Sequence, residues 1–320
     1  MARLEIGLTP WRYDAASPAE ALSEQAVRAE SLGFGSFWLP ESHFTGSGAN
    51  PAPLLLLAAL AARTRTIRLA TTSFLLPIRN ALQVAEEVAV LDCLSGGRVI
   101  LGVGRGFRAP LFAAFGVPVA EKRDRFEAAL AVMRDAWSGK PVTPEGEGGA
   151  VLLAPLPVQQ PHPPIWVAAF GPKALAQAGR LGLPYLASPI EPFSRLCANY
   201  AAHRSAIEQT HGELELAVPI MRSVFAHPDA ATRERVSAGL ERQAAALAGA
   251  RQAAIRNAAP TSLDEWALVG EPDAVADQLA RYREVLGITH LIARPALPGV
   301  DELDVLESLD HLARLADATP

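Results

Sequence analysis

The chain has 320 residues, half of them hydrophobic, and a formal net charge of −5 at pH 7. The length fits one large α/β barrel or two ordinary domains, and the negative charge gives no electrostatic reason to expect nucleic acid as a partner. No run approaches the roughly eighteen apolar residues of a membrane span, and the first residues lack the pattern of a secretory signal. Cys93 and Cys197 are too few and too far apart to predict a disulfide framework or a zinc site. We therefore expect a cytoplasmic protein without a metal and without a membrane segment.

Short apolar runs alternate with longer amphipathic runs along the chain. Eight runs are predicted as strands: Leu4–Leu8, Ser36–Leu39, Ile67–Thr71, Val99–Gly102, Ile165–Ala169, Tyr185–Ser188, Leu216–Phe225 and His290–Arg294. Helical segments lie between them, for example Asp124–Ser138, where apolar side chains recur at spacings of three and four. This alternation predicts parallel strands, and eight repeats favour a single-domain (β/α)8 TIM barrel over an open doubly wound sheet.

Two segments interrupt the alternation. Residues 139–164 are rich in proline and glycine and are predicted to form an inserted loop before the fifth strand. Residues 230–266 begin as an alanine-rich helical stretch and continue through the irregular sequence APTSLDEW, which could cover the barrel mouth. We therefore expect one barrel domain over residues 1–320 with insertions at about 139–164 and 230–266.

The active sites of such barrels lie at the C-terminal ends of the strands. The residues that follow the predicted strands are Glu41-Ser42-His43, Thr71-Thr72-Ser73, Gly104-Arg105-Gly106 and Phe170-Gly171-Pro172-Lys173, with Ser188 and Arg294 at two later ends. His290 begins its strand and His162 lies in the proline-rich loop. His43 is therefore the histidine best placed for function.

The sequence LSGGRVILGVGRG, Leu94 to Gly106, contains a strand followed by alternating glycines. It matches neither the P-loop, which ends in Gly-Lys-Ser/Thr, nor the Gly-x-Gly-x-x-Gly of dinucleotide-binding domains. The glycine amides and the planar fork of Arg105 could hold a phosphate. A tight turn that carries a solvated arginine is the alternative.

Several segments together resemble the luciferase-like flavin monooxygenases, the superfamily of bacterial luciferase and the F-420-dependent oxidoreductases. They are FWLPESHF, AALAARTRTIRLATTSFLLPIRNALQVAEEVAVLDCLSGGRVILGVGRG, RFEAALAVMRDAWSGKPV, PHPPIWVAAFGPKALAQAGRLGLP and LVGEPDAVADQLARYREVLGITHLI. The resemblance covers most of the chain except about residues 232–266. It implies a (β/α)8 barrel, usually a homodimer, that binds reduced FMN or the deazaflavin coenzyme F-420 (F420 below) at the barrel mouth.

The resemblance also implies roles for particular residues. Arg105 matches the arginine that grips the FMN phosphate, and Gly171 and Ala174 match positions that complete this phosphate site, which suits a helix N-terminus. Thr72 and Ser73 match a place where some relatives hold a cis peptide against the flavin ring. The full set of residues predicted to bind the cofactor is Thr71, Thr72, Ser73, Gly104, Arg105, Gly106, Phe170, Gly171, Lys173 and Ala174, in which Lys173 is either an added charge or a solvated lysine.

The chain departs from luciferase at one position. Luciferase has Glu-His-His-Phe where this chain has Glu41-Ser42-His43-Phe44, so Ser42 replaces the histidine that usually has the catalytic role. His43 matches the second histidine and the histidine of the Asp-His-Phe motif of F420-dependent relatives. The predicted catalytic residues are His43, as an acid or base or as a structural histidine under the cofactor, and Ser42, as a hydrogen-bonding group.

The resemblance favours FMN over F420, because the Gly-Arg-Gly form around Arg105 is typical of FMN-using relatives. The predicted function is a flavin-dependent monooxygenase that uses reduced FMN and O2 to oxygenate a small apolar substrate. Reduced FMN would come from a separate flavin reductase or from NAD(P)H in the same pocket. The alternatives are an F420-dependent hydride-transfer oxidoreductase and a flavin-binding protein without turnover.

Two further expectations concern surfaces. Aromatic residues that could line an apolar substrate pocket are Trp11, Phe74, Phe107 and Trp266, although core residues look the same in a sequence. The helices predicted around residues 51–63 and 80–94 would form the interface of the homodimer.

Overall fold

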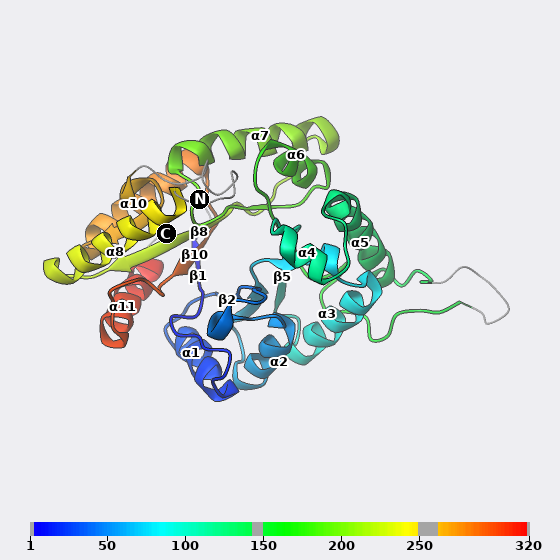
Figure 1. The fold of residues 1–320 in the computed structure, drawn as a ribbon, viewed down its shortest axis with the longest axis horizontal. Coiled ribbons are helices and arrows are strands. Elements are labelled where there is room, and N and C mark those ends of the chain that lie inside the picture. Colours follow the sequence, from blue (N-terminus) through cyan, green and yellow to red (C-terminus); the bar gives the residue numbers. More distant parts are fainter. Residues whose placement is uncertain (1–2, 143–149, 249–261, 319–320) are drawn as a thin grey trace. The chain divides into compact units, whose positions relative to one another are not determined.

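A computed structural model describes residues 3–142, 150–248 and 262–318 of the chain (Figure 1). These residues form two compact units. Unit 1 comprises Met1–Arg12, Arg28–Trp38 and Ala169–Pro320, and unit 2 comprises Tyr13–Val27 and Leu39–Ala168. Parts of both predicted insertions, residues 143–149 and 249–261, lie outside the described residues.

The strands of unit 1 are parallel. They are β1 (Glu5–Leu8), β2 (Ser36–Leu39, of which Leu39 belongs to unit 2), β7 (Tyr185–Leu186), β8 (Pro219–Ala226), β9 (Ala267–Gly270) and β10 (His290–Arg294). They pair in the order β2, β1, β10, β8 and β9, and a single bridge between Ala187 and Ile220 joins the end of β7 to β8. Strand β8 is long enough to pair with β10 through its first five residues and with β9 through its last four.

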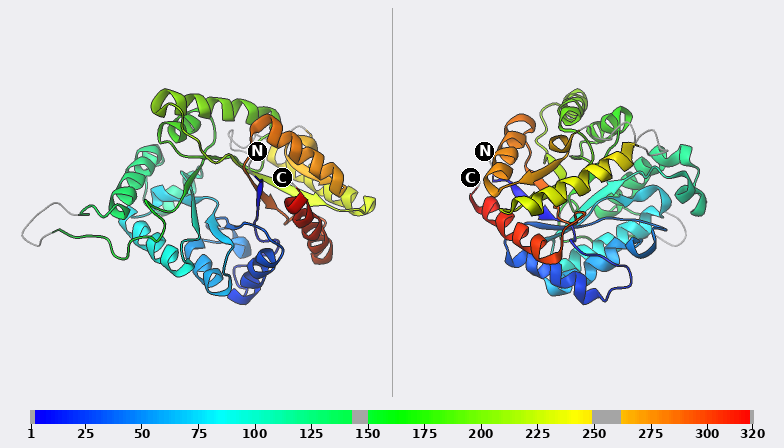
Figure 2. Two further views of the ribbon diagram at one scale, coloured as in Figure 1. Left: turned by 180° about the vertical axis from the view of Figure 1, so that it is seen from behind. Right: turned by 60° about the vertical axis from the view of Figure 1, so that its left-hand side comes forward.

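The described helices that lie wholly in unit 1 are α6 (Pro172–Arg180), α7 (Phe193–His211), α8 (Ala230–Ala248), α10 (Pro272–Leu286) and α11 (Glu302–Ala318). Helix α7 packs against both α6 and α10, and α10 packs against α11 (Figure 2). Helix α8 instead packs against β9, where Val236 and Leu240 join Phe225, Trp266 and Ala267 in one buried apolar cluster. Trp266 is therefore a core residue of unit 1.

The strands of unit 2 are β3 (Arg68–Thr71), β4 (Phe74–Leu75), β5 (Val99–Gly104) and β6 (Ile165–Ala168), all parallel, with β5 paired to the other three. The helices are α2 (Pro53–Arg63), α3 (Ala81–Ser95), α4 (Ala109–Ala114) and α5 (Lys122–Trp137), and α1 (Ala19–Ser31) contributes its first two turns. Helix α3 packs between α2 and α5. It begins where the Asn80 side chain accepts hydrogen bonds from two backbone amides, and it ends at Gly96 in the left-handed conformation, as helix capping predicts.

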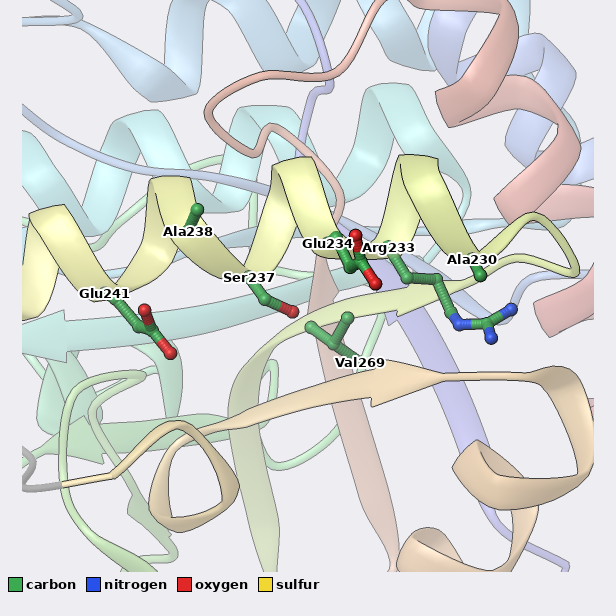
Figure 3. A pocket seen from close by; sticks show the side chains of 7 residues that line it. All are labelled: Ala230, Arg233, Glu234, Ser237, Ala238, Glu241 and Val269. Carbon is green, nitrogen blue, oxygen red and sulfur yellow. The ribbon is translucent and has the colours of Figure 1, made fainter.

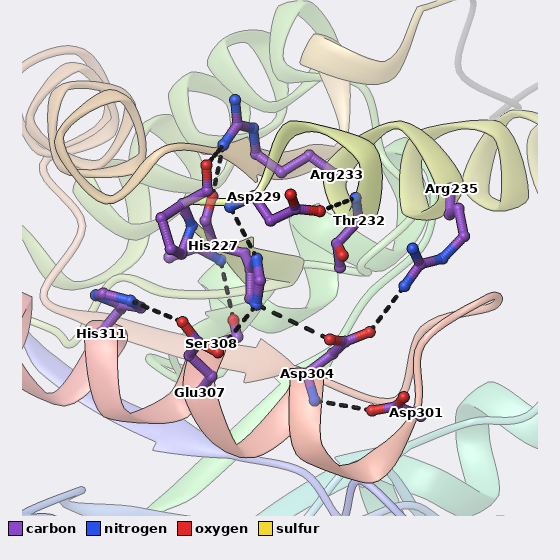
Figure 4. Close-up of polar contacts among 12 residues, drawn as sticks. His227, Asp229, Thr232, Arg233, Arg235, Asp301, Asp304, Glu307, Ser308 and His311 are labelled. Atoms are coloured by element: carbon purple, nitrogen blue, oxygen red, sulfur yellow. Dashed lines mark hydrogen bonds and ion pairs between the residues drawn. The ribbon is translucent and has the colours of Figure 1, made fainter.

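A polar cluster joins α8 and α11 to the end of β8 (Figure 4). The His227 Nε2 atom lies 3.3 Å from Glu307 Oε2 and 3.9 Å from Asp304 Oδ1, both on α11. Asp304 also pairs with Arg235 of α8 at 3.0 Å. The backbone amide of Asp229 donates a hydrogen bond to His227 Nδ1. This cluster fixes the start of α8 on unit 1.

All eight predicted strands are present with their expected order in the chain. Two short strands, β4 and β9, were not predicted. Within the described ranges 3–142, 150–248 and 262–318, no helix has both the length and the apolar composition needed to span a membrane.

A buried histidine in unit 1 predicts acid sensitivity. His203 is 4% exposed, and its ring lies 2.9 Å from the Leu183 carbonyl oxygen through Nε2. Burial lowers the pKa of His203, and the hydrogen bond to Leu183 opposes this shift only in part. The unfolded chain therefore binds a proton on this residue at a higher pH than the folded chain does.

We expect the stability that depends on neutral His203 to be complete above the unfolded pKa of about 6.5 and to be lost as the pH falls below it. Urea unfolding of the wild type and of His203→Asn at several pH values from neutral to mildly acidic would measure this. The variant should show a smaller loss of stability on acidification. Equal losses in the two proteins would contradict this prediction.

Candidate active site

His43 is held by a buried carboxylate in the loop after β2. The Glu41 side chain is fully buried, and its Oε1 atom lies 2.6 Å from His43 Nε2 and 2.9 Å from Arg79 Nη1. Its Oε2 atom accepts the backbone N–H of Leu75 at 3.0 Å. The Glu41 carboxylate, which also pairs with Arg79, accepts a hydrogen bond from Nε2–H of the imidazole. In neutral His43 this leaves Nδ1 as the acceptor of a proton.

The surroundings of His43 are aromatic. The ring of Phe115 meets the imidazole edge-on with centroids 5.2 Å apart, and Phe44 lies 5.9 Å away. Phe44 has a φ of 58° and a side chain that is 70% exposed, although His43 itself is only 8% exposed. A histidine oriented by a carboxylate and largely shielded from water has the arrangement of a general base.

Ser42, the other predicted catalytic residue, makes its hydrogen bonds within its own loop. Its hydroxyl donates to the Gly48 carbonyl oxygen at 2.9 Å and accepts the backbone N–H of Asn50 at 3.0 Å. The backbones of Ser42 and Asn50 also form an antiparallel bridge. These bonds hold the loop that carries His43.

The segment after β3 meets the His43 loop and the end of β5 within unit 2. The Thr72–Ser73 peptide bond is cis, at the place where the family resemblance indicates one. Strand β4 follows, and its Leu75 contacts Glu41 through the backbone and pairs with Gly104 in register. A Cβ atom at Gly104 would overlap the Ser73 side chain, which explains the glycine. Thr71 is fully buried, and its hydroxyl donates to the Gly102 carbonyl oxygen at 2.8 Å.

Arg105 is a buried cation directly after β5. It is 8% exposed, its Nη2 donates to the Ala168 carbonyl oxygen at 3.4 Å, and its guanidinium lies 5.6 Å from the centre of the Phe126 ring. Burial lowers the pKa of Arg105 to about 10, and the nearby charge of Arg123 contributes to the same shift. The protein thus holds a cation in surroundings that disfavour its charge.

Lys122, at the start of α5, adds a second partly buried charge. Its Nζ donates to the Gly106 carbonyl oxygen at 3.2 Å. Burial is the largest cause that lowers the pKa of Lys122, followed by the charges of Arg123 and Arg105. The three cations Arg105, Lys122 and Arg123 form what we call the β5 cationic cluster. Such a cluster is complementary to a multiply charged anion such as a phosphate.

The remaining predicted cofactor residues lie in unit 1, at the start of α6. Gly171 is the N-cap residue with a φ of 83°, and Phe170 before it is 39% exposed. Lys173 is exposed and Ala174 is buried in the first turn. The Ala174 N–H donates to the Gly171 carbonyl oxygen at 3.0 Å, and the positive end of the helix dipole favours an anion at this position.

The aromatic residues predicted to line a substrate pocket differ in their surroundings. Phe74 is buried and stacks under the Arg79 guanidinium at 4.0 Å, and Trp266 belongs to the core of unit 1. Phe107 is 56% exposed. A hollow of about 350 Å³ between α8 and β9 is lined by Ala230, Arg233, Glu234, Ser237, Ala238, Glu241 and Val269 (Figure 3). It shares no residue with the predicted site.

The contributions of Arg79, Lys122 and Arg123 were not found by sequence reasoning. Arg79 lies four residues past β4 and Lys122 begins a helix whose apolar spacing indicated only packing. The adjacent basic pair at 122 and 123 was the available signal.

Parallel strands that alternate with helices, with polar residues at the C-terminal strand ends, are typical of α/β barrel enzymes. The family model described as luciferase-like monooxygenase matches residues 5–290, so the chain belongs to this family. The crystal structure of the monooxygenase RslO1 from Streptomyces bottropensis matches with a TM-score of 0.80 and 27% identity, covering 97% of this chain and 98% of that one. The expected (β/α)8 TIM-barrel fold class is thereby confirmed.

Relatives in the family include two kinds of oxidoreductase. The F420-dependent glucose-6-phosphate dehydrogenase of Kineococcus radiotolerans is 29% identical over 88% of this chain and 88% of its own length. The oxygenase component of the flavin-dependent trigonelline monooxygenase of Acinetobacter baylyi is 29% identical over 51% of this chain and 46% of its own length. Two curated relatives with 35% identity are matched over about half of their length, 47% and 46%.

Proposed function

We propose that the protein is a flavin-dependent monooxygenase that binds reduced FMN and oxygenates a small, largely apolar substrate. The observation that carries this proposal is the β5 cationic cluster, in which Arg105 is buried beside Lys122 and Arg123. A phosphate would compensate the charges that burial makes costly. Arg105 would hold the FMN phosphate through its planar guanidinium.

The bound flavin would supply two electrons, so that one atom of O2 enters the substrate and the other leaves as water. The residues of the chain would then have separate tasks. Glu41 and Arg79 keep His43 in one tautomer, and His43 Nδ1 accepts or returns a proton. Phe115 and the buried position of the imidazole limit access of water to this atom. Ser42 keeps the loop in place.

We further infer that a separate flavin reductase delivers the reduced FMN. The trigonelline relative is named as an oxygenase component, which supports a two-component arrangement. NAD(P)H entering the same pocket is the other source of electrons.

F420-dependent hydride transfer is the second candidate. It is favoured by the F420-dependent relative that is aligned over 88% of this chain. F420 also carries a phosphate, so the β5 cationic cluster suits both cofactors, and the Gly-Arg-Gly sequence around Arg105 is what favours FMN.

Oxygen uptake tests the proposed function. The protein would be mixed with reduced FMN, supplied by an unrelated flavin reductase with NADH, and with a panel of apolar aliphatic and aromatic compounds. A substrate should divert O2 from hydrogen peroxide into an oxygenated product, which mass spectrometry detects. Reduction of F420 by an organic substrate without oxygen incorporation would instead establish the second candidate.

A homodimer through α2 and α3 is the proposed assembly. Large apolar side chains on these two adjacent helices are exposed, namely Leu55 at 73% and Leu94 at 62%. Leu55→Asp should therefore shift sedimentation towards the monomer, whereas Leu303→Asp, at a 78% exposed leucine of α11, should not. A wild type that sediments as a monomer would contradict the proposal.

A further inference from the structure

The last residue of β10 is an arginine that faces the side of the sheet away from the helices. Arg294 pairs in register with Ser223 of β8. The residue before Ser223 is Arg222, whose Nε donates to the Tyr282 hydroxyl of α10, so the Arg222 side chain points into the helix layer. Successive side chains of a strand alternate between the two faces. Ser223, and Arg294 beside it, therefore lie on the inner face.

The layer below this pair is apolar. Two residues earlier on the same face lie Met221 and Ile292, also partners in register, which are 5% and 0% exposed. Arg294 is partly accessible to solvent, whereas Ser223 is 1% exposed. The two polar groups thus cap an apolar layer at the C-terminal ends of two neighbouring strands, the end of a barrel at which substrates bind.

Neither polar group is satisfied by the part of the chain that the structure describes. Ser223 Oγ is buried without a hydrogen-bond partner among these residues. Among the side chains that the structure describes, those of residues 3–142, 150–247 and 262–315, Arg294 has no hydrogen-bond, ion-pair or ring partner. Burial alone lowers its pKa. The neighbouring Arg222 shows the contrast, because its guanidinium donates to the carbonyl oxygens of Ser188, Glu191 and Met221.

Buried polar groups in native proteins nearly always have partners, and a partnerless one needs an explanation. A largely surrounded arginine without an anion is costly, since desolvation of its charge is not compensated. A ligand that carries an anion would satisfy both groups at once.

We propose that Arg294 and Ser223 bind the carboxylate of the substrate, so that the substrate is an organic acid. The planar guanidinium donates two parallel N–H bonds to a carboxylate, and the serine hydroxyl donates a third. This inference rests on the proposed function and narrows its substrate class. It assigns to Arg294 specificity for the substrate, whereas the cofactor phosphate belongs to the β5 cationic cluster.

The test compares acids with their neutral isosteres. Binding of benzoate, cyclohexanecarboxylate and octanoate, and of the corresponding primary amides, would be measured by calorimetry on the protein saturated with FMN. The wild type should bind at least one acid about 10-fold or more tightly than its amide, the size expected for a charge-assisted contact. Arg294→Met should abolish this preference, Ser223→Ala should reduce it, and Arg294→Lys should keep part of it.

Two controls separate the outcomes. Arg235→Met removes an exposed arginine of α8 and should leave the preference for acids unchanged. Thermal unfolding without ligand shows whether each variant is folded. An acid that binds should then raise the Tm of the wild type and not that of Arg294→Met. The affinity for reduced FMN should be the same in Arg294→Met and in the wild type.

Each contrary result has a distinct meaning. The proposal is wrong if no acid of the panel binds the wild type more tightly than its amide, or if Arg294→Met keeps the preference. Loss of FMN affinity in Arg294→Met would assign Arg294 to the cofactor, which overturns this inference and leaves the proposed function standing. If Arg294→Met loses the preference for acids and the wild type never incorporates oxygen into a substrate, the anion site is supported and the monooxygenase function is refuted.

Discussion

Arg105→Ala should weaken the binding of reduced FMN by about 10-fold or more, because a charge-assisted hydrogen bond contributes about 1.5–3 kcal/mol. The loss should be specific for the phosphate, so riboflavin, which has the same ring without it, should bind the wild type and the variant equally. Anaerobic fluorescence titration measures both ligands. The variant should fold normally, since it removes a buried cation whose charge burial already disfavours.

The matched control is Arg125→Ala. Arg125 lies on the same helix as Lys122 and Arg123, but its side chain is 46% exposed and pairs with Glu121 one turn away. We expect no change in FMN affinity, since exposed pairs of this kind contribute little. Indifference of FMN binding to Arg105→Ala would remove the observation on which the proposed function rests.

His43→Gln should lower the rate of substrate oxygenation by about 10² to 10⁴, the usual contribution of a positioned acid or base. Glutamine can still donate to Glu41, so the loop and the affinity for FMN should persist. Steady-state turnover and FMN titration measured on one preparation distinguish the two effects.

Glu41→Gln tests how His43 is positioned. The change removes the carboxylate that fixes the imidazole tautomer, so we expect a smaller loss of turnover together with an altered pH profile. His311→Gln, a change on α11, should have no effect. Turnover of His43→Gln close to that of the wild type would assign the imidazole a purely structural role under the cofactor.

The fold was predictable because each strand is a short apolar run with its own turn signals. Strand β9, directly after the predicted insertion 230–266, was not predicted, because its pairing depends on the last four residues of an eight-residue partner, β8, which no local pattern indicates. Strand β4 has only two residues and depends on its register with β5.

The candidate site was predictable where it follows strand ends. His43 and Arg105 stand directly after predicted strands. The residue that holds Glu41, and through it His43, was not predictable, because Arg79 and Glu41 are 38 residues apart in the sequence. Ser42 was predicted as a catalytic residue from its position beside His43. Its hydrogen bonds to Gly48 and Asn50 depend on how the loop folds back, which the sequence does not indicate.

An anaerobic titration of the wild-type protein with reduced FMN and with reduced F420 in the same buffer tests the cofactor directly. We expect tighter binding of reduced FMN. Tighter binding of reduced F420 would contradict it and would direct the search for substrates to hydride transfer without oxygen.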